Sequence, residues 1–344
     1  MITQWFGTRR KNKVELHLHL DGAVRVETFL DVARRRGIEL PTRTPEGLAR
    51  YVRVAHDCRS LTQFLATFDF FIPIIQDGEA IERIAYELCE DQARVGVRYF
   101  EARFSPQLLA RDGLAVEEVV ERVLVGLERG QRAFEVGARA ILCCMRHRPD
   151  WSMEVVRLAV RYREHGVVGI DLAGDESRFG AELHAEAYRA AREMGLHRTV
   201  HAGEAGPAHN IREALDLLGA ERIGHGYRLV DDEELYARVR EEDIPLECCL
   251  TSSLQTGSVP DLATHPVRRF VLDGLNVSLS TDDPSVSGID LEHEYRLALS
   301  DLGFGLADLT RMVFNAARSS FLPPAEQRRL IAELKREYLP PDVL

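Results

Sequence analysis

The chain has 344 residues, of which 45% are hydrophobic and 29% charged, and its formal net charge is −11. This is the profile of a globular protein, and the length suits one barrel-type domain with insertions as well as two smaller domains. The acidic balance argues against a nucleic-acid or anionic-membrane partner, since both require a basic patch. No apolar run approaches the length of a membrane span, so we expect no membrane partner.

The six cysteines indicate a reducing compartment. Four of them form adjacent pairs inside the apolar runs ILCCM and LECCL, and no C-x-x-C spacing occurs. We expect them to be small buried hydrophobic residues, neither disulfide-bonded nor zinc-binding. A cytoplasmic location follows from this expectation.

The first predicted element is a strand within residues 13–22, which read KVELHLHLDG. Apolar and polar residues alternate with the period of a strand, so His17 and His19 project from one face and Asp21 follows them. Two imidazoles and a carboxylate at this spacing form half of a metal site. Alone the pattern is weak, because a surface strand can carry histidines by chance.

Seven further strands alternate with helical patterns along the chain. The strands are predicted at 97–104, 138–145, 167–172, 197–201, 222–225, 244–250 and 276–280. The helices are predicted at 24–36, 79–94, 116–134, 152–164, 181–193, 210–218, 232–240 and 266–272. Eight strands, each followed by a helix, favour a (β/α)8 TIM barrel over an open doubly wound sheet, because no dinucleotide or P-loop glycine motif occurs. We expect one domain over 1–344, with the barrel at 13–322 and extra helices at 291–299, 306–316 and 325–336.

In such a barrel, functional groups lie at the C-terminal ends of the strands. Potential metal ligands do gather there, in DLAGD (171–175), HAGE (201–204), GHG (224–226) and STDDP (280–284). The histidines outside these ends are predicted to be structural: His56, His147, His165, His184, His197, His209, His265 and His293.

His17, His19 and His201 with one carboxylate give a nitrogen-and-oxygen donor set that suits zinc, although iron or another divalent metal is compatible. A metal in a catalytic site lowers the pKa of water toward neutrality. Glu204 and His225 are then available for proton transfer, while Asp282 and Asp283 divide between metal and substrate. The strand ends therefore predict metal-assisted hydrolysis with a separate acid and base.

The motifs KVELHLHLDG, ARAILCCMRHRP, DLAGDE, HRTVHAGE, RIGHGY and STDDP resemble those of the adenosine deaminase family, in the family's order and over nearly the whole chain. The resemblance implies a (β/α)8 barrel that converts adenosine to inosine and ammonia, with 2′-deoxyadenosine as a further candidate substrate. It also implies one zinc ion per chain, held by His17, His19, His201 and Asp282. Glu204 would protonate the purine ring nitrogen beside the reacting carbon, and His225 would orient or deprotonate the attacking water.

The resemblance also implies a purine nucleoside site. Asp283 would contact the imidazole side of the ring, Gly174 would donate a backbone N–H to the pyrimidine side, and Asp21 would hold a ribose hydroxyl. Four apolar residues at helical spacing would cover the pocket mouth: Leu61, Phe64, Leu65 and Phe68. Two departures concern the pocket beyond the ribose. The segment at 106–116 is shorter than in animal members, and the stretch at 249–253 lacks the usual proline.

Three different functions are also compatible with parts of this pattern. A 5′-substituted adenosine, such as the aminodeoxyfutalosine of menaquinone synthesis, is the second substrate candidate, with Arg25 or the altered rim to meet its carboxylate. A phosphotriesterase-like or amidase-type hydrolase would need a lysine at the fourth strand end, where Asp171 and Leu172 stand instead. A non-catalytic binding protein on the same scaffold would be expected to lack a ligand or the acid. The sequence specifies no oligomeric state.

Overall fold

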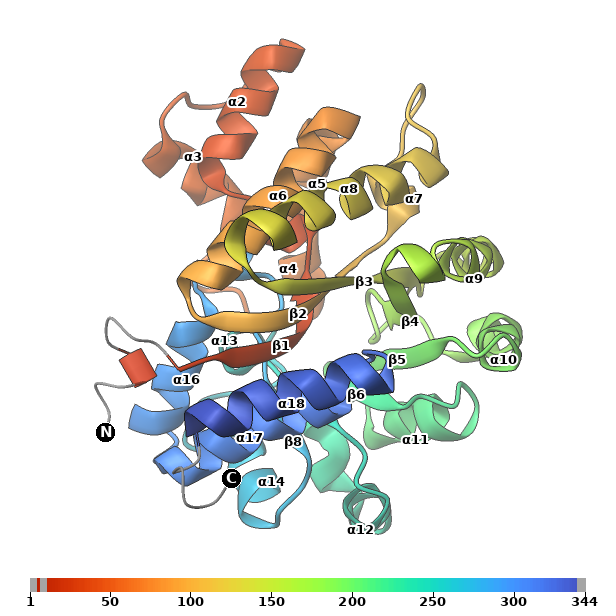
Figure 1. Cartoon of the computed structure of the whole chain (residues 1–344), viewed down its shortest axis with the longest axis vertical. Coiled ribbons are helices and arrows are strands. Elements are labelled where there is room, and N and C mark those ends of the chain that lie inside the picture. The colour runs from red at the N-terminus through yellow and green to blue at the C-terminus, as the bar shows by residue number, and fades with distance from the viewer. Residues whose placement is uncertain (1–4, 7–10, 339–344) are drawn as a thin grey trace.

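The computed structural model describes residues 5–6 and 11–338. Eight parallel strands follow one another in the sheet in chain order, as the sequence predicts. They are β1 (Lys13–His19), β2 (Val97–Phe104), β3 (Gly137–Met145), β4 (Val167–Ala173), β5 (His197–Ala202), β6 (Arg222–His225), β7 (Leu246–Cys248) and β8 (Val277–Leu279). Helices surround this sheet on its outside (Figure 1), so the predicted (β/α)8 barrel is confirmed.

The barrel closes where the first and last strands meet, here called the β1–β8 junction. Leu18 pairs with Asp282 in an isolated parallel bridge. The His19 N–H donates to the Asp282 carbonyl at 2.8 Å, and the Asp282 N–H donates to the His17 carbonyl at 3.1 Å. The backbone that closes the barrel is therefore the backbone that carries three of the predicted site residues.

Along β1, the alternation of apolar and polar residues does not separate a buried face from a solvent-exposed one, because both faces are buried. Val14, Leu16 and Leu18 are fully buried against the surrounding helices. Glu15 and His17 are also fully buried, because they face the barrel interior, where His17 meets the Glu247 carboxylate and Glu15 accepts the Thr281 N–H. The interior of this barrel is thus a paired polar network, and its apolar core lies between strands and helices.

The α-helices follow the predicted order with additional short ones. They are α2 (Val26–Arg36), α3 (Pro45–Val52), α4 (Leu61–Ala66), α5 (Phe68–Ile75), α6 (Gly78–Arg94), α7 (Pro106–Leu109), α8 (Val116–Phe134), α9 (Ser152–Arg161), α10 (Ala185–Glu193), α11 (Ala208–Asp216), α12 (Glu233–Glu241), α13 (Leu250–Gln255), α14 (Val267–Leu272), α15 (Pro284–Ser287), α16 (Leu291–Ser300), α17 (Leu306–Ser319) and α18 (Pro324–Tyr338). The last three confirm the predicted extra helices, and α17 packs against β1 and β8.

Local chemistry explains several helix boundaries. Asp77 caps α6 by accepting the Ala80 N–H, and Thr44 caps α3 by accepting the Gly47 N–H. Gly37 ends α2 in the left-handed conformation, as predicted. Short 3-10 turns replace the predicted helical ends at Arg163–His165 and Glu182–His184.

The seventh strand is shorter than the predicted range of 244–250. It ends at Cys248, and the following helix α13 begins at Leu250. The buried carboxylate of Glu294 accepts the Leu250 N–H at 2.6 Å and the Thr251 N–H at 3.2 Å, so the chain turns into a helix at this point. The stretch 249–253, which lacks the usual proline, thus begins a helix whose first N–H groups bind Glu294.

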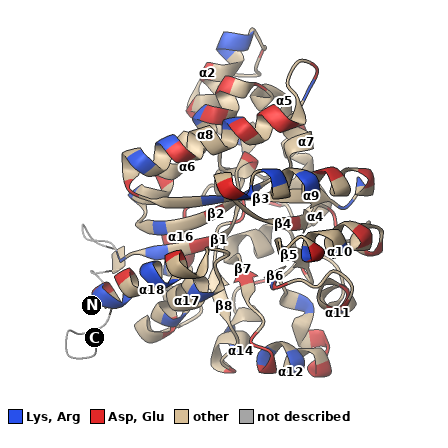
Figure 2. Cartoon of the chain, turned by 45° about the vertical axis from the view of Figure 1, so that its right-hand side comes forward, with Lys and Arg blue, Asp and Glu red and all other residues tan. Residues whose placement is uncertain are grey.

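Lys and Arg stand beside Asp and Glu along the outer helices (Figure 2). On α6 and α8, for example, Glu82 pairs with both Arg122 and Arg129. Within residues 5–6 and 11–338, no helix is both long and apolar enough to cross a membrane.

Candidate active site

The predicted site residues gather in one cavity at the C-terminal ends of the strands. The cavity measures about 600 Å³ and is lined by His19, Asp21, His201, Glu204, His225, Asp282 and Asp283, among others. A larger groove of about 890 Å³ lies near the starts of β3, β4 and β5, at the opposite end of the barrel, and no predicted site residue lines it. The chemistry therefore belongs to the smaller cavity.

Four side chains offer ligand atoms that converge on one point: His17, His19, His201 and Asp282. The Nε2 atoms of His19 and His201 lie 3.2 Å apart. Asp282 Oδ1 lies 3.2 Å from His17 Nε2 and 3.3 Å from His19 Nε2. Zinc–nitrogen bonds of 2.0–2.1 Å in a tetrahedron place ligand atoms about 3.3 Å apart. The donor set and its spacing thus fit a zinc ion.

Buried carboxylates orient two of these histidines. Glu247 Oε2 lies 2.8 Å from His17 Nδ1, and Asp171 Oδ2 lies 2.9 Å from His201 Nδ1. Each carboxylate accepts the Nδ1–H, so each Nε2 lone pair is free to bind a metal. His17 Nε2 is buried without a hydrogen-bond partner, as a metal ligand would be. Burial lowers the pKa of His201 to about 4, which keeps its ring neutral.

Arg103 joins the two orienting carboxylates. Its guanidinium donates to Glu247 at 2.8 Å and to Asp171 at 3.2 Å, and all three side chains are fully buried. Burial alone would raise the pKa of Glu247, but the charges of Arg103 and Arg222 hold it well below its usual range. The carboxylates therefore remain ionised acceptors for the histidine N–H groups.

Asp282 is fixed by its backbone and by a hydroxyl group. Its φ of +65° lies in the left-handed region, which aspartate tolerates better than most residues. Ser252 Oγ donates to Asp282 Oδ2 at 2.7 Å, so Oδ1 is the oxygen that faces His17 and His19. Burial alone would raise the pKa of Asp282, but the neighbouring imidazoles of His17 and His19 hold it well below its usual range.

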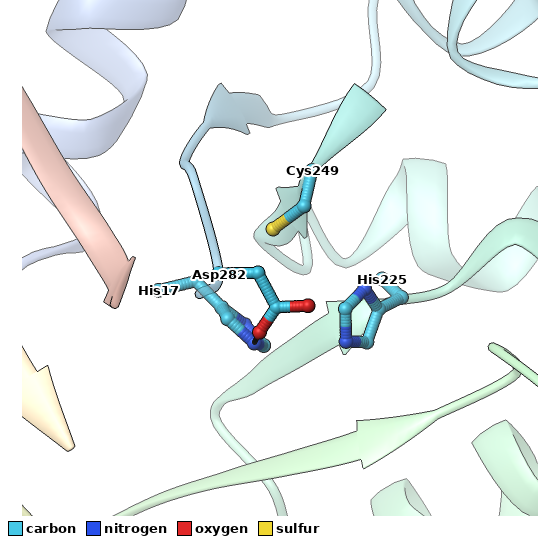
Figure 3. A group of neighbouring side chains, drawn as sticks. All are labelled: His17, His225, Cys249 and Asp282. Atoms are coloured by element: carbon cyan, nitrogen blue, oxygen red, sulfur yellow. Dashed lines mark ion pairs between the residues drawn. The ribbon is translucent and has the colours of Figure 1, made fainter. Parts of the chain in front are cut away.

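A second group of possible ligands shares two residues with the first. It consists of His17, His225, Cys249 and Asp282, whose side chains lie together in Figure 3. Burial, together with the charges of Asp282 and Glu294, raises the pKa of the Cys249 thiol well above its usual range. Because only the thiolate is a good ligand, the three-histidine set is the better metal site. All six cysteines are free and buried, as predicted.

Glu204 and His225 are close enough to act on the same reacting group. Glu204 Oε2 lies 3.7 Å from His225 Nε2, and Glu204 Oε1 is buried without a hydrogen-bond partner. Burial, with the charges of Asp282 and Glu176, raises the pKa of Glu204 well above its usual range. Burial also lowers the pKa of His225 well below its usual range. These shifts favour the protonated form of Glu204 and the neutral form of His225, as a general acid and a base would require.

Asp21 and Asp283 bring two further carboxyl groups into the cavity, each with one oxygen buried and unpartnered. Burial raises the pKa of both, and the neighbouring charge of Asp282 adds to this effect at Asp283. Asp21 lies beyond the end of β1, in the 3-10 turn Asp21–Ala23, and so does not share the strand face with the histidines. A Cβ atom at Gly22 would overlap the Asp283 carboxylate, so this position needs glycine.

An apolar wall covers one side of the cavity. Leu61, Phe64 and Leu65 on α4 and Phe68 on α5 all line it, as does Gly174. The predicted single helix is divided at Thr67 into α4 and α5. Thr62 on α4 donates to Asp175 Oδ2 at 2.7 Å, which ties this wall to the loop after β4.

Two sequence-based interpretations require correction. His147, predicted to be structural, lines the cavity. Arg25, considered as the partner of a substrate carboxylate, donates instead to Asp91 and Glu90 on α6 and does not line the cavity.

Sequence reasoning missed several buried polar residues that hold the site together: Arg103, Glu176, Glu247 and Ser252. For Arg103 and Glu247, the available signal was a charged residue within an otherwise apolar strand, in the runs ARF (102–104) and LEC (246–248). Such a residue needs a buried partner.

Comparisons with known proteins agree with this site. The sequence model of the family described as adenosine deaminase matches residues 12–337. Adenosine deaminase from Bos taurus is 46% identical over 344 residues, covering 95% of this chain and 94% of the bovine chain. The crystal structure of an adenine deaminase from Arthrobacter aurescens superposes with a TM-score of 0.87 at 31% identity, covering 94% of this chain and 98% of that one. An amidohydrolase from Burkholderia ambifaria with bound Zn has a TM-score of 0.86 at 30% identity, covering 95% and 90%.

Proposed function

The chain belongs to the adenosine deaminase family, and from this membership and the site geometry we propose that it catalyses the hydrolytic deamination of adenosine to inosine and ammonia. The observation that carries the proposal is the buried carboxyl of Glu204 next to the three-histidine set. Because the pKa of this carboxyl is raised, it can donate a proton to a ring nitrogen of the purine while a water attacks the adjacent carbon.

The proposed metal is one zinc ion per chain, bound by His17, His19, His201 and Asp282. When bound, the ion acts as a Lewis acid and lowers the pKa of water toward neutrality. The converging donor atoms and the carboxylates that orient His17 and His201 support this assignment.

The protein groups have separate tasks in the proposed reaction. His225 accepts a hydrogen bond from the attacking water and aims it at carbon 6 of the purine. Glu204 protonates the ring nitrogen beside that carbon. One proton of the water passes through His225 to the amino nitrogen, which leaves as ammonia, and the other returns to Glu204 as the carbonyl at carbon 6 forms. Asp283 contacts the imidazole side of the ring, and a protonated carboxyl there donates a hydrogen bond. Its raised pKa supports this role.

The remaining cavity residues fit a nucleoside. Gly174 would donate its backbone N–H to the pyrimidine side of the ring, and Asp21 would accept a ribose hydroxyl. The apolar wall of Leu61, Phe64, Leu65 and Phe68 would cover the bound purine nucleoside, and 2′-deoxyadenosine is a further proposed substrate. Asp21 also disfavours free adenine, the substrate named for the Arthrobacter neighbour, because adenine has no hydroxyl for it.

A different substrate, a two-metal reaction and a non-catalytic role all receive less support. A 5′-substituted adenosine with a carboxylate would meet Asp21, and Arg25 is paired elsewhere. A two-metal hydrolase would need a lysine at the end of β4, where Asp171 instead orients His201. A non-catalytic protein is disfavoured because all four proposed ligands and the acid are present.

We further propose that residues 1–344 form one domain. We also propose that the protein acts in the cytoplasm, and the buried free thiols support this location.

A panel of purine substrates tests the function. Adenosine, 2′-deoxyadenosine, adenine, AMP and N6-methyl-AMP are compared by the absorbance change at loss of the 6-amino group. We expect adenosine to give the highest kcat/KM. No turnover of adenosine, or faster turnover of adenine, would contradict the proposal.

A further inference from the structure

Glu176 lies in the loop after β4 and is only 4% exposed, yet it is a charged residue outside the proposed reaction. Its carboxylate accepts hydrogen bonds from four successive backbone N–H groups. Gly203 donates to Oε1 at 2.6 Å, and Glu204, Ala205 and Gly206 donate to Oε2 at 3.0, 3.1 and 3.0 Å. A fifth donor, Asn210 Nδ2, lies 3.0 Å from Oε1.

The segment bound in this way is the turn between β5 and α11. It begins two residues after the proposed metal ligand His201 and carries the proposed acid Glu204. Consecutive N–H groups that point inward form an anion-binding concavity. Here a side chain of the same protein fills it, and the negative charge satisfies donors that would otherwise be buried without partners.

Space around the carboxylate is also fixed. A Cβ atom at Gly206 would lie 2.9 Å from the Glu176 Cδ and would overlap Asn210 Nδ2. Gly203 adopts a φ of +69°, in the left-handed region that favours glycine. The backbone of this turn is therefore held from one side by Glu176 and cannot shift without losing several hydrogen bonds at once.

We propose that Glu176 is a positioning residue for the general acid, because its carboxylate fixes the backbone at 203–206 and thereby the side chain of Glu204. The inference rests on the proposed role of Glu204. The charge of Glu176 also disfavours ionisation of Glu204, which agrees with a proton donor at that position. Glu176 itself does not line the cavity and so does not touch the substrate.

The first test is Glu176→Gln, which has nearly the same shape but turns an amide NH2 toward backbone donors. A misplacement of a catalytic group by a fraction of an ångström to 1 Å reduces rates by up to ~10²-fold, so we expect kcat to fall about 10- to 100-fold. KM and metal content should stay near the wild-type values. Asn210→Ala is the matched control, because it removes one donor and leaves the four backbone bonds, and its kcat should stay close to wild type.

A double-mutant cycle separates positioning from general loss of structure. In the Glu204→Gln background there is no acid to position, so Glu176→Gln should cause little further loss of kcat. An equal loss in both backgrounds would overturn the proposal, as would a wild-type kcat in the single variant. If Glu176→Gln does not fold, Gly206→Ala displaces the carboxylate from the other side and should show the same non-additivity. Failure of wild type to deaminate adenosine would instead refute the proposed function.

Discussion

The buried carboxyl of Glu294 makes a quantitative prediction about stability. It is fully buried, and it accepts hydrogen bonds from Leu250 and Thr251 at the start of α13. Burial raises its pKa from an ordinary 4.5 to about 7, against the smaller opposite effect of these hydrogen bonds. The folded protein therefore binds this proton more tightly than the unfolded chain does. The stabilising contribution is complete below pH 4.5 and is lost as the pH rises through 7.

The size of the effect follows from the shift. A rise from 4.5 to about 7 corresponds to about 3 kcal/mol when the carboxyl is fully ionised. Between pH 5 and pH 8 the lost contribution grows from about 1 to about 3 kcal/mol. Glu294→Gln stays neutral throughout, so its free energy of unfolding should gain about 2 kcal/mol on wild type over this range.

Urea unfolding followed by circular dichroism, at pH 5 and pH 8 and at one metal concentration, measures this difference. Glu234→Gln, at a position 88% exposed, is the matched control and should show no comparable change. If the difference between Glu294→Gln and wild type were the same at both pH values, the carboxyl would not carry a raised pKa, and the reasoning from burial would be refuted.

Other predictions concern the reaction. A strong chelator should abolish turnover and zinc should restore it, and His201→Ala should lose bound zinc together with activity; a demetallated protein at full rate would contradict the metal site. Glu204→Gln should lower kcat by at least ~10²-fold with unchanged zinc content, and a near-normal kcat would place the acid elsewhere. If Asp21 binds the 5′-hydroxyl, 5′-deoxyadenosine should lose roughly 10- to 150-fold in kcat/KM, and Asp21→Ala should nearly erase that difference. Equal rates for the two nucleosides in wild type would exclude this contact.

Much of the candidate site could be predicted because a parallel barrel brings the C-terminal ends of its strands to one edge. His17, His201 and Asp282 are distant in sequence, yet each lies within three residues of the C-terminal end of a strand, so the topology alone places them together. Their residue types then indicate the metal chemistry.

The supporting interactions could not be predicted, because they join residues whose pairing no local pattern records. A charged residue in a buried strand shows that a partner exists, but not that Arg103 would meet Glu247, 144 residues away. The early end of β7 likewise depends on Glu294, 44 residues further along the chain. The predicted helix at Leu61 through Phe68 shows the same limit, since its division at Thr67 leaves the apolar spacing unchanged.

The β1–β8 junction has a consequence for how the protein is made. His17 and His19 lie on the first strand and leave the ribosome early, whereas Asp282 follows only after seven further strands. The complete set of proposed ligands cannot exist until the barrel closes, so high-affinity metal uptake would be a late event. A metal ion held by these residues would also stabilise the closed barrel, because its ligands come from both ends of the sheet. On loss of the ion, the β1–β8 junction should therefore open more readily than the strand pairs on the opposite side of the barrel.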